Sequence, residues 1–350
     1  MISLAVKYRP KRFEDVVGQS ATVRILQNQL QNNETKQAYL FIGSAGCGKT
    51  TCARIFANEL NHGVGSPIEL DAASHNSVDD IRELTKQAQM QSIAGEYKVF
   101  ILDELHMLSG GAWAALLKLI EEPPAKTVFI GCTTNPEKIP KTILSRCQRF
   151  DFRRMQNDEI VKRLKHIIAQ EQKDFENENQ YEKYLGYDAE SLEFIAKQAN
   201  GGMRDAITLL DKCLSYSPDL TIDNVVKALG AVGYDVYIKL FNYLFFDDTD
   251  KAVTLIEQVY SDGVDIKQLV DDLCWFVTDI LKYRLTRSFD YLSIPQTEEI
   301  EEFLAEFGED PNEPDPVKNI LDLILKIKTE IKYDSNPKYL VEAMIISYGT

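Results

Sequence analysis

The sequence has no apolar stretch as long as the roughly 18 residues that a membrane-spanning helix requires. Basic residues stand near its start, at Lys7, Arg9, Lys11 and Arg12, but no apolar segment follows them as it would in a signal peptide. Internal repeats and long linkers are also missing. We therefore expect a cytoplasmic protein rather than a membrane or secreted one.

Cysteine is sparse, with six residues in 350, and no two of them form a Cys-x-x-Cys pair. This spacing favours neither a disulfide framework nor a zinc site. We expect ordinary, mostly buried thiols at Cys47, Cys52, Cys132, Cys147, Cys213 and Cys274.

Positive charge is in deficit, since the formal net charge is −15, and this excludes a protein whose whole surface binds nucleic acid. The deficit is uneven. Residues 1–155 carry 19 Lys and Arg against 16 Asp and Glu, whereas residues 156–350 carry 20 against 38. A phosphate-binding surface is therefore expected in the first part of the chain.

What the chain does contain is a Gly-x-x-x-x-Gly-Lys-Thr motif, the nucleoside-triphosphate P-loop. Glycines let backbone N–H groups turn inward around phosphate oxygens, and a helix that begins near Lys49 adds its positive end. Lys49 is expected to neutralise the β- and γ-phosphates, and Thr50 to ligate Mg²⁺. An apolar strand at 38–42 and helical periodicity from Thr51 onward favour this interpretation over an ordinary glycine-rich turn. The motif consists of Gly43, Ser44, Ala45, Gly46, Cys47, Gly48, Lys49 and Thr50.

A second chemical motif follows four apolar residues at 99–102, which are typical of a strand buried on both faces of a parallel sheet. Asp103 and Glu104 stand at its carboxyl end, where ligands of open α/β sheets bind. Asp103 can hold the hydration shell of Mg²⁺, and Glu104 can orient and activate a water molecule. The alternative is a carboxylate pair that ends a strand in solvent, and the P-loop upstream makes it the weaker interpretation.

Hydrophobic periodicity divides the chain into two parts. Strands are expected at 38–42, 68–71, 99–102 and 127–132, and they alternate with helices as in a doubly wound α/β domain. Beyond residue 154 the pattern is helical, with the acidic run 298–302 interpreted as surface and turn. The fold class is therefore α/β followed by all-α.

Several polar residues remain ambiguous on residue type alone. Thr134 follows the strand at 127–132 and can reach a γ-phosphate, but this signal is weak. Arg146 is a lone arginine of the kind usually found on a surface or in a salt bridge. Arg204, in the first turn of a helix expected at 203–216, opposes the helix dipole, which suggests either an anionic partner or an ordinary surface position.

A long set of motifs in a fixed order resembles the AAA+ clamp-loader ATPases, most closely the gamma/tau family of bacterial DNA polymerase III. The resemblance covers nearly the whole length. The motifs are Lys7-Tyr-Arg-Pro10, Phe13-x-Asp-Val-Val-Gly-Gln19, the P-loop, Glu69-x-Asp-Ala-Ala-Ser74, Asp103-Glu-Leu-His-Met-Leu-Ser109, Ala115-Leu-Leu-Lys-x-Ile-Glu-Glu-Pro-Pro124, Thr133-Thr-Asn-Pro-x-Lys-Ile-Pro140, Ile143-Leu-Ser-Arg-Cys147, Met203-Arg-Asp-Ala206 and, more weakly, Ser335-Asn-Pro337.

The resemblance implies roles for the ambiguous residues. Thr134 resembles the sensor near the γ-phosphate, Arg146 the arginine finger that acts on the neighbouring subunit's ATP, and Arg204 the second sensor. The implied adenine-side wall and remaining nucleotide contacts are Ala5, Tyr8, Arg9, Pro10, Val16, Val17, Thr51 and Met203. The implied domains are a P-loop AAA+ ATPase domain with a parallel sheet at 1–155, a small helical lid domain at 156–230 and a C-terminal helical collar domain at 231–350.

Two departures from the family pattern are visible. The bacterial family carries a four-cysteine zinc module after the P-loop helix, whereas here a short turn at 61–67 takes its place, so we predict no zinc. His75, Asn76, Ser77 and Gly110 stand where basic residues facing DNA are common. The remaining candidates for DNA contacts are Arg82, Lys86, Ser109 and Lys118. A short, zinc-free chain of this kind suits a bacteriophage or a divergent lineage.

The function implied by the resemblance is that of an ATP-hydrolysing motor subunit of a DNA sliding-clamp loader. It would use ATP and Mg²⁺, and its partners would be the sliding clamp, other loader subunits in a five-membered ring, and primer–template DNA. One alternative is a non-hydrolysing structural subunit of the same ring, which would lose P-loop or acidic residues. Another is a different AAA+ DNA motor, such as a hexameric branch-migration motor without a collar. The expected location is the bacterial cytoplasm or a phage-infected cell.

Overall fold

The computed structural model describes residues 2–90, 94–177, 185–230, 232–292, 294, 298–306 and 316–349. The chain divides into two units, each of which is described by itself. Unit 1 comprises residues 1–181 and 195–211, and unit 2 comprises residues 182–194 and 212–350. None of the described helices is long and apolar enough to cross a membrane.

Unit 1 is built on a parallel sheet with the strand order β2-β3-β4-β1-β5. The sheet has five strands, one more than the sequence pattern predicts, because β5 carries polar residues around a single buried Phe150. Ile42 at the end of β1 pairs in register with Thr133 of β4 and Asp151 of β5, so the carboxyl ends of these strands meet at one edge. The strands are β1 (Ala38–Ile42), β2 (Ile68–Asp71), β3 (Lys98–Asp103), β4 (Thr127–Thr133) and β5 (Gln148–Asp151).

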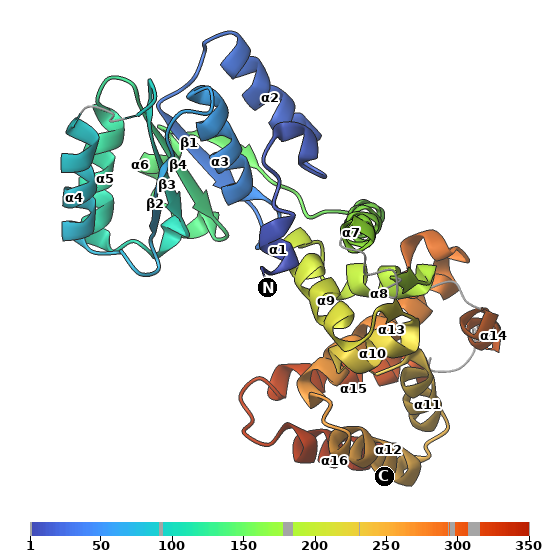
Figure 1. Ribbon diagram of the computed structural model, residues 1–350. Helices are drawn as coiled ribbons and strands as arrows, with labels where there is room; N and C mark the ends of the chain where they lie inside the picture. The colour runs from blue at the N-terminus through green and yellow to red at the C-terminus, as the bar shows by residue number, and fades with distance from the viewer. Residues whose placement is uncertain are drawn as a thin grey trace. The chain divides into compact units, whose positions relative to one another are not determined.

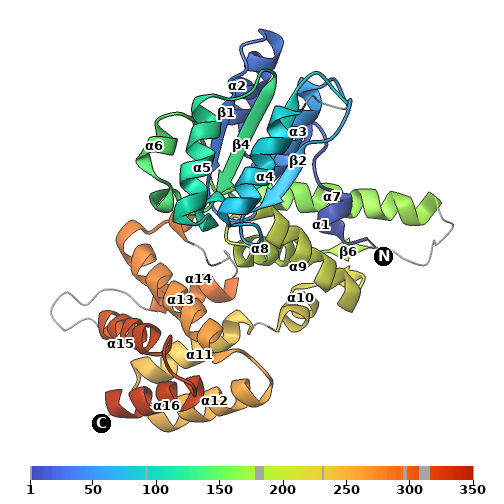
Figure 2. The ribbon, with the colours of Figure 1, turned by 90° about the vertical axis from the view of Figure 1, so that its left-hand side faces the viewer.

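Helices cover both faces of this sheet, because successive side chains of a buried strand point to opposite faces. Phe41 and Ile101 pack with Phe56 of α3, whereas Phe100 and Phe129 stack on the other face, among residues of α4 and α5. Figure 1 shows α2 and α3 on one side of the sheet and α4 and α5 on the other, and Figure 2 looks onto the α4–α5 side. The helices of these layers are α2 (Ser20–Gln31), α3 (Lys49–Leu60), α4 (Val78–Gln89), α5 (Gly110–Glu121) and α6 (Lys141–Leu144).

Further helices of unit 1 flank the sheet domain. A short helix α1 (Leu4–Lys7) and the single turn η1 (Phe13–Asp15) precede α2, and the turns η2 (Leu105–Met107) and η3 (Pro136–Lys138) follow β3 and β4. The long helix α7 (Asn157–Asn177) comes after β5. Helices α8 (Ala189–Gln198) and α9 (Met203–Tyr216) each run across the boundary between the two units. Helix α7 extends to Asn177, and residues 178–184 lie outside the described part.

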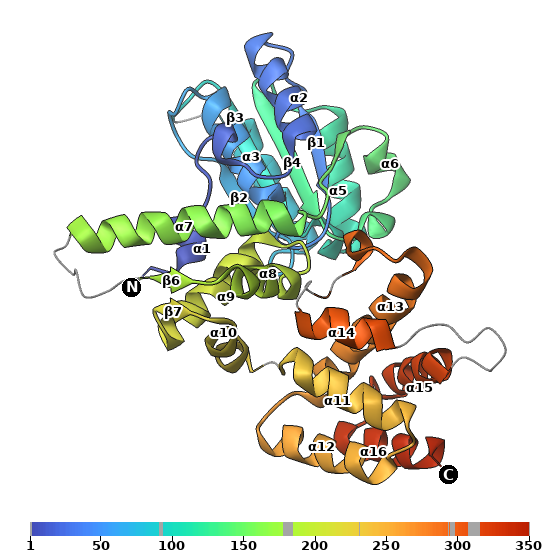
Figure 3. The same cartoon turned by 90° about the vertical axis from the view of Figure 1, so that its right-hand side faces the viewer.

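The helices of unit 2 beyond residue 232 pack around an apolar core, and the unit also contains a two-stranded parallel ladder of β6 (Gly186–Tyr187) and β7 (Asp219–Leu220). Phe241, Val277 and Ile320 are fully buried in that core. Figure 3 shows α12 and α16 lying along each other. The helices are α10 (Ile222–Leu229), α11 (Tyr234–Phe245), α12 (Thr249–Ser261), α13 (Ile266–Thr286), α14 (Glu298–Glu306), α15 (Pro316–Glu330) and α16 (Pro337–Tyr348), and the turn η4 (Phe289–Tyr291) follows α13.

Candidate nucleotide site

The P-loop connects β1 to α3 at the carboxyl edge of the sheet, as the motif predicts. Gly46 and Gly48 have φ of +71° and +101°, a region that residues with a Cβ adopt only with strain. A Cβ built on Gly43 would lie 2.5 Å from the carbonyl oxygen of Phe152, which excludes any larger residue there. The loop therefore has the backbone of an anion cradle, and it leads directly into the N-terminus of α3.

Lys49 is buried to 6% exposure although its side chain carries a positive charge. Its Nζ donates hydrogen bonds to the carbonyl oxygens of Gly43 and Ser44, at 2.9 and 2.8 Å. Among the described residues, no carboxylate lies within ion-pair distance of this ammonium group. A buried cation that is satisfied only by carbonyl dipoles has a strong preference for an added anion.

The hydroxyl group of Thr50 donates a hydrogen bond of 2.9 Å to Oδ2 of Asp103. These two side chains come from the first turn of α3 and the last residue of β3. A hydroxyl and a carboxylate oxygen together are the hard oxygen donors that Mg²⁺ prefers. The pair therefore fits a magnesium ion that accompanies a nucleotide held in the P-loop.

Glu104 lies one residue beyond β3 in an unusual conformation, with φ of +45°. Its Oε2 accepts a hydrogen bond of 3.1 Å from Oγ1 of Thr134, which directly follows β4. The sequence-predicted water-activating residue and sensor residue are therefore in contact. A non-glycine residue in the left-handed region is uncommon, and such strain concentrates at functional sites.

A pocket in unit 1 joins the P-loop to the N-terminal segment and to the start of α9. Most of the predicted nucleotide residues line it: Ala5, Tyr8, Arg9, Pro10, Val16, Val17, Ala45, Gly46, Gly48, Lys49, Thr50, Thr51, Asp103, Glu104, Met203 and Arg204. Gly43, Ser44, Cys47, Thr134 and Arg146 are not among the lining residues. Cys47 is fully buried, and its Sγ lies 3.0 Å from the position that a Cβ on Gly43 would take.

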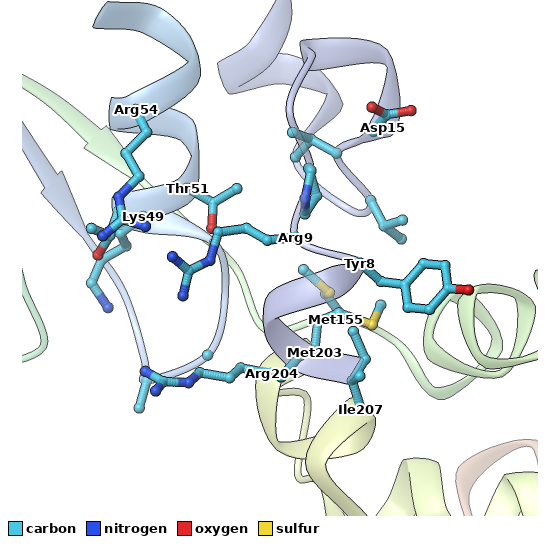
Figure 4. Close-up of a pocket in the computed structure, with 18 of the residues that line it drawn as sticks. Tyr8, Arg9, Asp15, Lys49, Thr51, Arg54, Met155, Met203, Arg204 and Ile207 are labelled. Atoms are coloured by element: carbon cyan, nitrogen blue, oxygen red, sulfur yellow. The ribbon is translucent and has the colours of Figure 1, made fainter. Parts of the chain in front are cut away.

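Four arginines line this pocket, Arg9, Arg54, Arg163 and Arg204, and three of them lie close enough to affect one another. Burial lowers the pKa of Arg9, and the nearby positive charges of Arg54 and Arg204 lower it further. Glu69 opposes this effect and forms a 2.6 Å ion pair with Arg54. Figure 4 shows Arg9, Arg204 and Lys49 extending toward the same part of the pocket. This positive charge suits a polyphosphate ligand.

The N-terminal segment is held in place by polar contacts with α7 and α9. The hydroxyl of Tyr8 donates to Oε1 of Glu171 at 2.6 Å, and its ring points away from Lys49 (Figure 4). Burial, together with this hydrogen bond, raises the pKa of Tyr8. The amide of Leu4 donates to Oδ2 of Asp211 at 3.0 Å. The predicted adenine-side wall is thus tied to the helix that carries Arg204.

Arg146 lies outside the pocket, just after α6. Its guanidinium forms a 2.7 Å ion pair with Glu121 of α5 and donates a hydrogen bond of 2.8 Å to the carbonyl oxygen of Thr142. Its side chain is 38% exposed, so another molecule can approach it.

The four predicted DNA residues lie on or before α4 and α5. Lys86 and Lys118 are exposed, and Arg82 forms a 2.9 Å ion pair with Asp79. Ser109 caps α5, and its amide donates to the carbonyl oxygen of Asn76 at 3.1 Å. This contact places the segments before α4 and α5 next to each other.

The sequence interpretation missed five residues that line the pocket, namely Asp15, Arg54, Met155, Arg163 and Ile207. Arg54 lies in the P-loop helix, close after Lys49 in the chain, so its place in α3 was a signal that could have found it. Met155, which lies between β5 and α7, and Ile207, in α9, carry no such signal, because apolar residues are most often core. All six cysteines are free thiols, and the described residues contain no cluster of three or more His, Cys, Asp and Glu that could hold a metal.

Three family models match consecutive parts of the chain. Residues 18–67 and 66–156 match "DNA polymerase III, delta subunit", and residues 159–219 match "DNA polymerase III clamp loader subunit, ATPase lid domain". Residues 220–348 match "DNA polymerase III subunits gamma and tau domain III".

Among solved structures, the Thermotoga maritima RuvB Holliday junction branch migration motor aligns with a TM-score of 0.52 over 87% of this chain and 99% of that chain. The sequence identity to that protein is 18%, so the similarity shows the fold alone: an AAA+ P-loop fold.

Two relatives among known proteins extend over nearly the whole chain. DNA polymerase III subunit tau of Bacillus subtilis is 36% identical over 97% of this chain, which covers 62% of that protein's length. DNA polymerase III subunit gamma of Buchnera aphidicola subsp. Schizaphis graminum is 30% identical over 98% of this chain and 96% of its own length. The chain therefore belongs to the gamma/tau family of DNA polymerase III clamp-loader subunits.

Proposed function

We propose that this protein is an ATP-hydrolysing motor subunit of a loader that opens a DNA sliding clamp and places it on primed DNA. The observation that carries the proposal is the joint presence of the P-loop cradle, the Thr50–Asp103 contact and Glu104 at one edge of the sheet. Family membership supports the same function. A P-loop that binds nucleotide without hydrolysis needs no carboxylate in the position of Glu104.

In this proposal each side chain has a defined task at the nucleotide. Lys49 leaves its carbonyl partners and neutralises the β- and γ-phosphates, while Thr50 and Asp103 hold Mg²⁺. Magnesium, when bound, neutralises further phosphate charge. Glu104 orients and activates the attacking water, and Thr134 holds the carboxylate of Glu104 and senses the γ-phosphate. Arg204 brings a further positive charge from α9.

We propose three roles along the chain: an ATPase domain at 1–155, a lid at 156–230 and a collar at 231–350 that joins five subunits into a ring. The family models at 159–219 and 220–348 support the last two roles. Arg146 would act as the arginine finger for the ATP of a neighbouring subunit, a role that its position outside its own pocket supports. The other proposed partners are the clamp, further loader subunits and primer–template DNA.

DNA contacts are proposed for Arg82, Lys86, Ser109 and Lys118. Support comes from the exposed lysines and from the adjacent N-terminal ends of α4 and α5, which suit phosphate groups. We also propose that the protein binds no zinc and acts in the cytoplasm of a bacterium or of a phage-infected cell. The bacterial origin of the relatives supports this location.

The decisive experiment compares ATP hydrolysis by the assembled loader, with clamp and primed DNA, for wild type and Lys49→Ala. Removal of the only ammonium group in the loop should lower DNA-stimulated hydrolysis by on the order of 10²–10³. Lys126→Ala is the matched control, because this exposed lysine pairs with Glu96 and lies outside the pocket. Unchanged turnover in the Lys49 variant would instead support a structural subunit that does not hydrolyse ATP.

The mass of the native complex distinguishes this proposal from a hexameric DNA motor, such as a branch-migration motor. Native mass spectrometry of the complex purified from its source should give five loader subunits together with a clamp. A homohexamer of this chain without a clamp would contradict the proposal.

A further inference from the structure

His106 lies against Glu104, and nothing in the site described so far gives it a role. Its side chain is 9% exposed, and its Nδ1 is 3.3 Å from Oε2 of Glu104. The same nitrogen is 3.1 Å from Oγ1 of Thr133. A nearly buried imidazole in contact with the proposed water-activating carboxylate requires an explanation.

The local backbone creates this contact. Glu104 adopts the left-handed conformation and begins the single turn η2, which is closed by a 2.9 Å hydrogen bond from the amide of Met107 to the carbonyl oxygen of Glu104. This tight turn brings the side chain two residues later back toward that of Glu104. The strain at Glu104 is therefore coupled to the position of His106.

The two neighbours of Nδ1 decide which ring nitrogen carries the proton. Oε2 of an ionised Glu104 offers only lone pairs, so it needs a donor at Nδ1. The hydroxyl of Thr133 can either donate or accept, and it accepts the amide hydrogen of Asn135 at 3.1 Å. With an unprotonated Nδ1, its lone pair would face the lone pairs of the Glu104 carboxylate at 3.3 Å. Repulsion between the lone pairs disfavours this tautomer, so Nδ1 carries a proton whether the ring is neutral or cationic.

We infer that His106 is a positioning residue, whose Nδ1–H holds the Oε2 atom of Glu104 and thereby fixes the orientation of this carboxylate for water activation. The inference rests on the proposed ATPase function. Thr134 also donates to Oε2, so two donors converge on one oxygen. Among the described residues nothing donates to Oε1, which leaves this oxygen for the attacking water.

Substitutions that keep or remove the donor test this role in the assembled loader. His106→Asn places an amide N–H close to the position of Nδ1, whereas His106→Leu keeps the volume and removes the donor. Loss of orientation at a reacting group can cost up to about 100-fold. We expect His106→Leu to lower kcat at least tenfold with KM for ATP unchanged, and His106→Asn to stay within about threefold of wild type.

Two kinetic results would overturn the inference: a Leu variant as active as wild type, or an Asn variant as impaired as the Leu variant. A wild-type loader that does not hydrolyse ATP would instead contradict the proposed function, so the two failures are distinguishable.

A measurement without turnover decides the inference independently of hydrolysis. The chain has only four histidines, so ¹⁵N-histidine labelling of the full-length protein gives a simple spectrum, and His106→Asn identifies the signal of His106. A proton on Nδ1 is expected. A neutral ring protonated only at Nε2 would place a lone pair toward Glu104 and would contradict the inference.

Discussion

Each unit of this protein buries a charged side chain, Lys49 in unit 1 and Asp279 in unit 2. The two charges differ in the groups that surround them. Within the described part of the chain, Lys49 of unit 1 has only the carbonyl oxygens of Gly43 and Ser44 as hydrogen-bond acceptors. Asp279 of unit 2, fully buried in α13, accepts hydrogen bonds from Nζ of Lys282 at 2.8 Å and from the amide of Ile294 at 3.0 Å. The charge in unit 2 is neutralised by a lysine of the same helix, whereas the charge in unit 1 has no carboxylate partner among the described residues.

The same contrast appears in the backbone. Glu104 and Arg287 both have left-handed φ values, of +45° and +51°. Arg287 ends α13 as its C-cap, a common place for this conformation. Glu104 instead follows a strand and faces the pocket. Of these two left-handed residues, the one in unit 2 ends a helix and the one in unit 1 lines the pocket.

The largest expected effect concerns Arg146, a charge outside its own pocket. Arg146→Ala should lower hydrolysis in the assembled ring by about 10³–10⁵, the usual contribution of an arginine finger. The nucleotide affinity of the isolated chain should not change, because Arg146 does not line its pocket. Steady-state hydrolysis and equilibrium nucleotide binding measure the two quantities.

Glu121→Ala is the control for Arg146, since it removes the ion-pair partner and leaves the guanidinium in place. This variant should keep most of the activity. Full DNA-stimulated hydrolysis by a verified monomer would contradict the role in trans.

Replacing the two buried charged residues by alanine should have different effects on stability: a loss at Asp279 and no loss at Lys49. Asp279→Ala leaves the Ile294 amide without its acceptor and should lower the free energy of unfolding of unit 2 by about 2–4 kcal/mol. Lys49→Ala removes an unpaired buried cation, so stability without nucleotide should stay the same or rise. Urea unfolding of both variants, in the absence of nucleotide, makes the comparison. A greater loss of stability for Lys49→Ala than for Asp279→Ala would refute the contrast between the units.

The affinity for DNA should depend on the sheet domain as a whole, and each single residue of that domain should contribute little to it. Each lysine that contacts a phosphate contributes a slope of about 0.9 to the plot of log K against log salt concentration. Lys86→Ala combined with Lys118→Ala should therefore reduce the slope by up to about 2 in the assembled loader. Lys239→Ala is the control, since this lysine of α11 in unit 2 is paired with Asp235. An equal change in slope for the control would exclude a specific contact by α4 and α5.

The smallest expected effect is at the start of α4. Ser77 and Asp80 form a capping box, in which the Ser77 hydroxyl accepts from the Asp80 amide at 3.2 Å and Oδ2 of Asp80 accepts from the Ser77 amide at 2.9 Å. Ser77→Ala should cost about 1 kcal/mol or less of stability in unit 1. Thermal unfolding is measured with and without nucleotide. Because the pocket lies in unit 1, the transition that shifts with nucleotide is that of unit 1, and the loss should appear in this transition.

The capping box also predicts a pH dependence. Hydrogen bonds from Ser77 hold the pKa of Asp80 below its usual value. A carboxylate with a lowered pKa in the folded state stabilises above its unfolded pKa, and this stabilisation disappears as the pH falls below about 4. Helical content of wild type should therefore decrease more between pH 5 and 3 than that of Ser77→Ala. Identical pH profiles would show that the hydrogen bonds of Ser77 do not affect this titration.

Helices and strands whose apolar residues recur at a regular spacing were predictable from the sequence. Elements whose apolar residues stand among charged or polar ones were not. The helix at 203–216 has the bounds expected from the sequence. The acidic run 298–302 was interpreted as surface and turn. Glu301 and Glu302 are exposed, but the run forms a helix, because its charges mask an apolar face of Ile300, Phe303 and Leu304 that is buried in α14. Strand β5 was missed for a similar reason, since Phe150 is its only buried residue.

The sequence by itself determined the family, the P-loop and the carboxylate pair at the end of β3. These features are contiguous, and their chemistry depends on residue type and local backbone. Only the tertiary structure brought Thr134 and His106 to Glu104, and Asp211 to the N-terminal segment. Such contacts join residues distant in the chain or turned back by strain, and they depend on packing that no local pattern encodes.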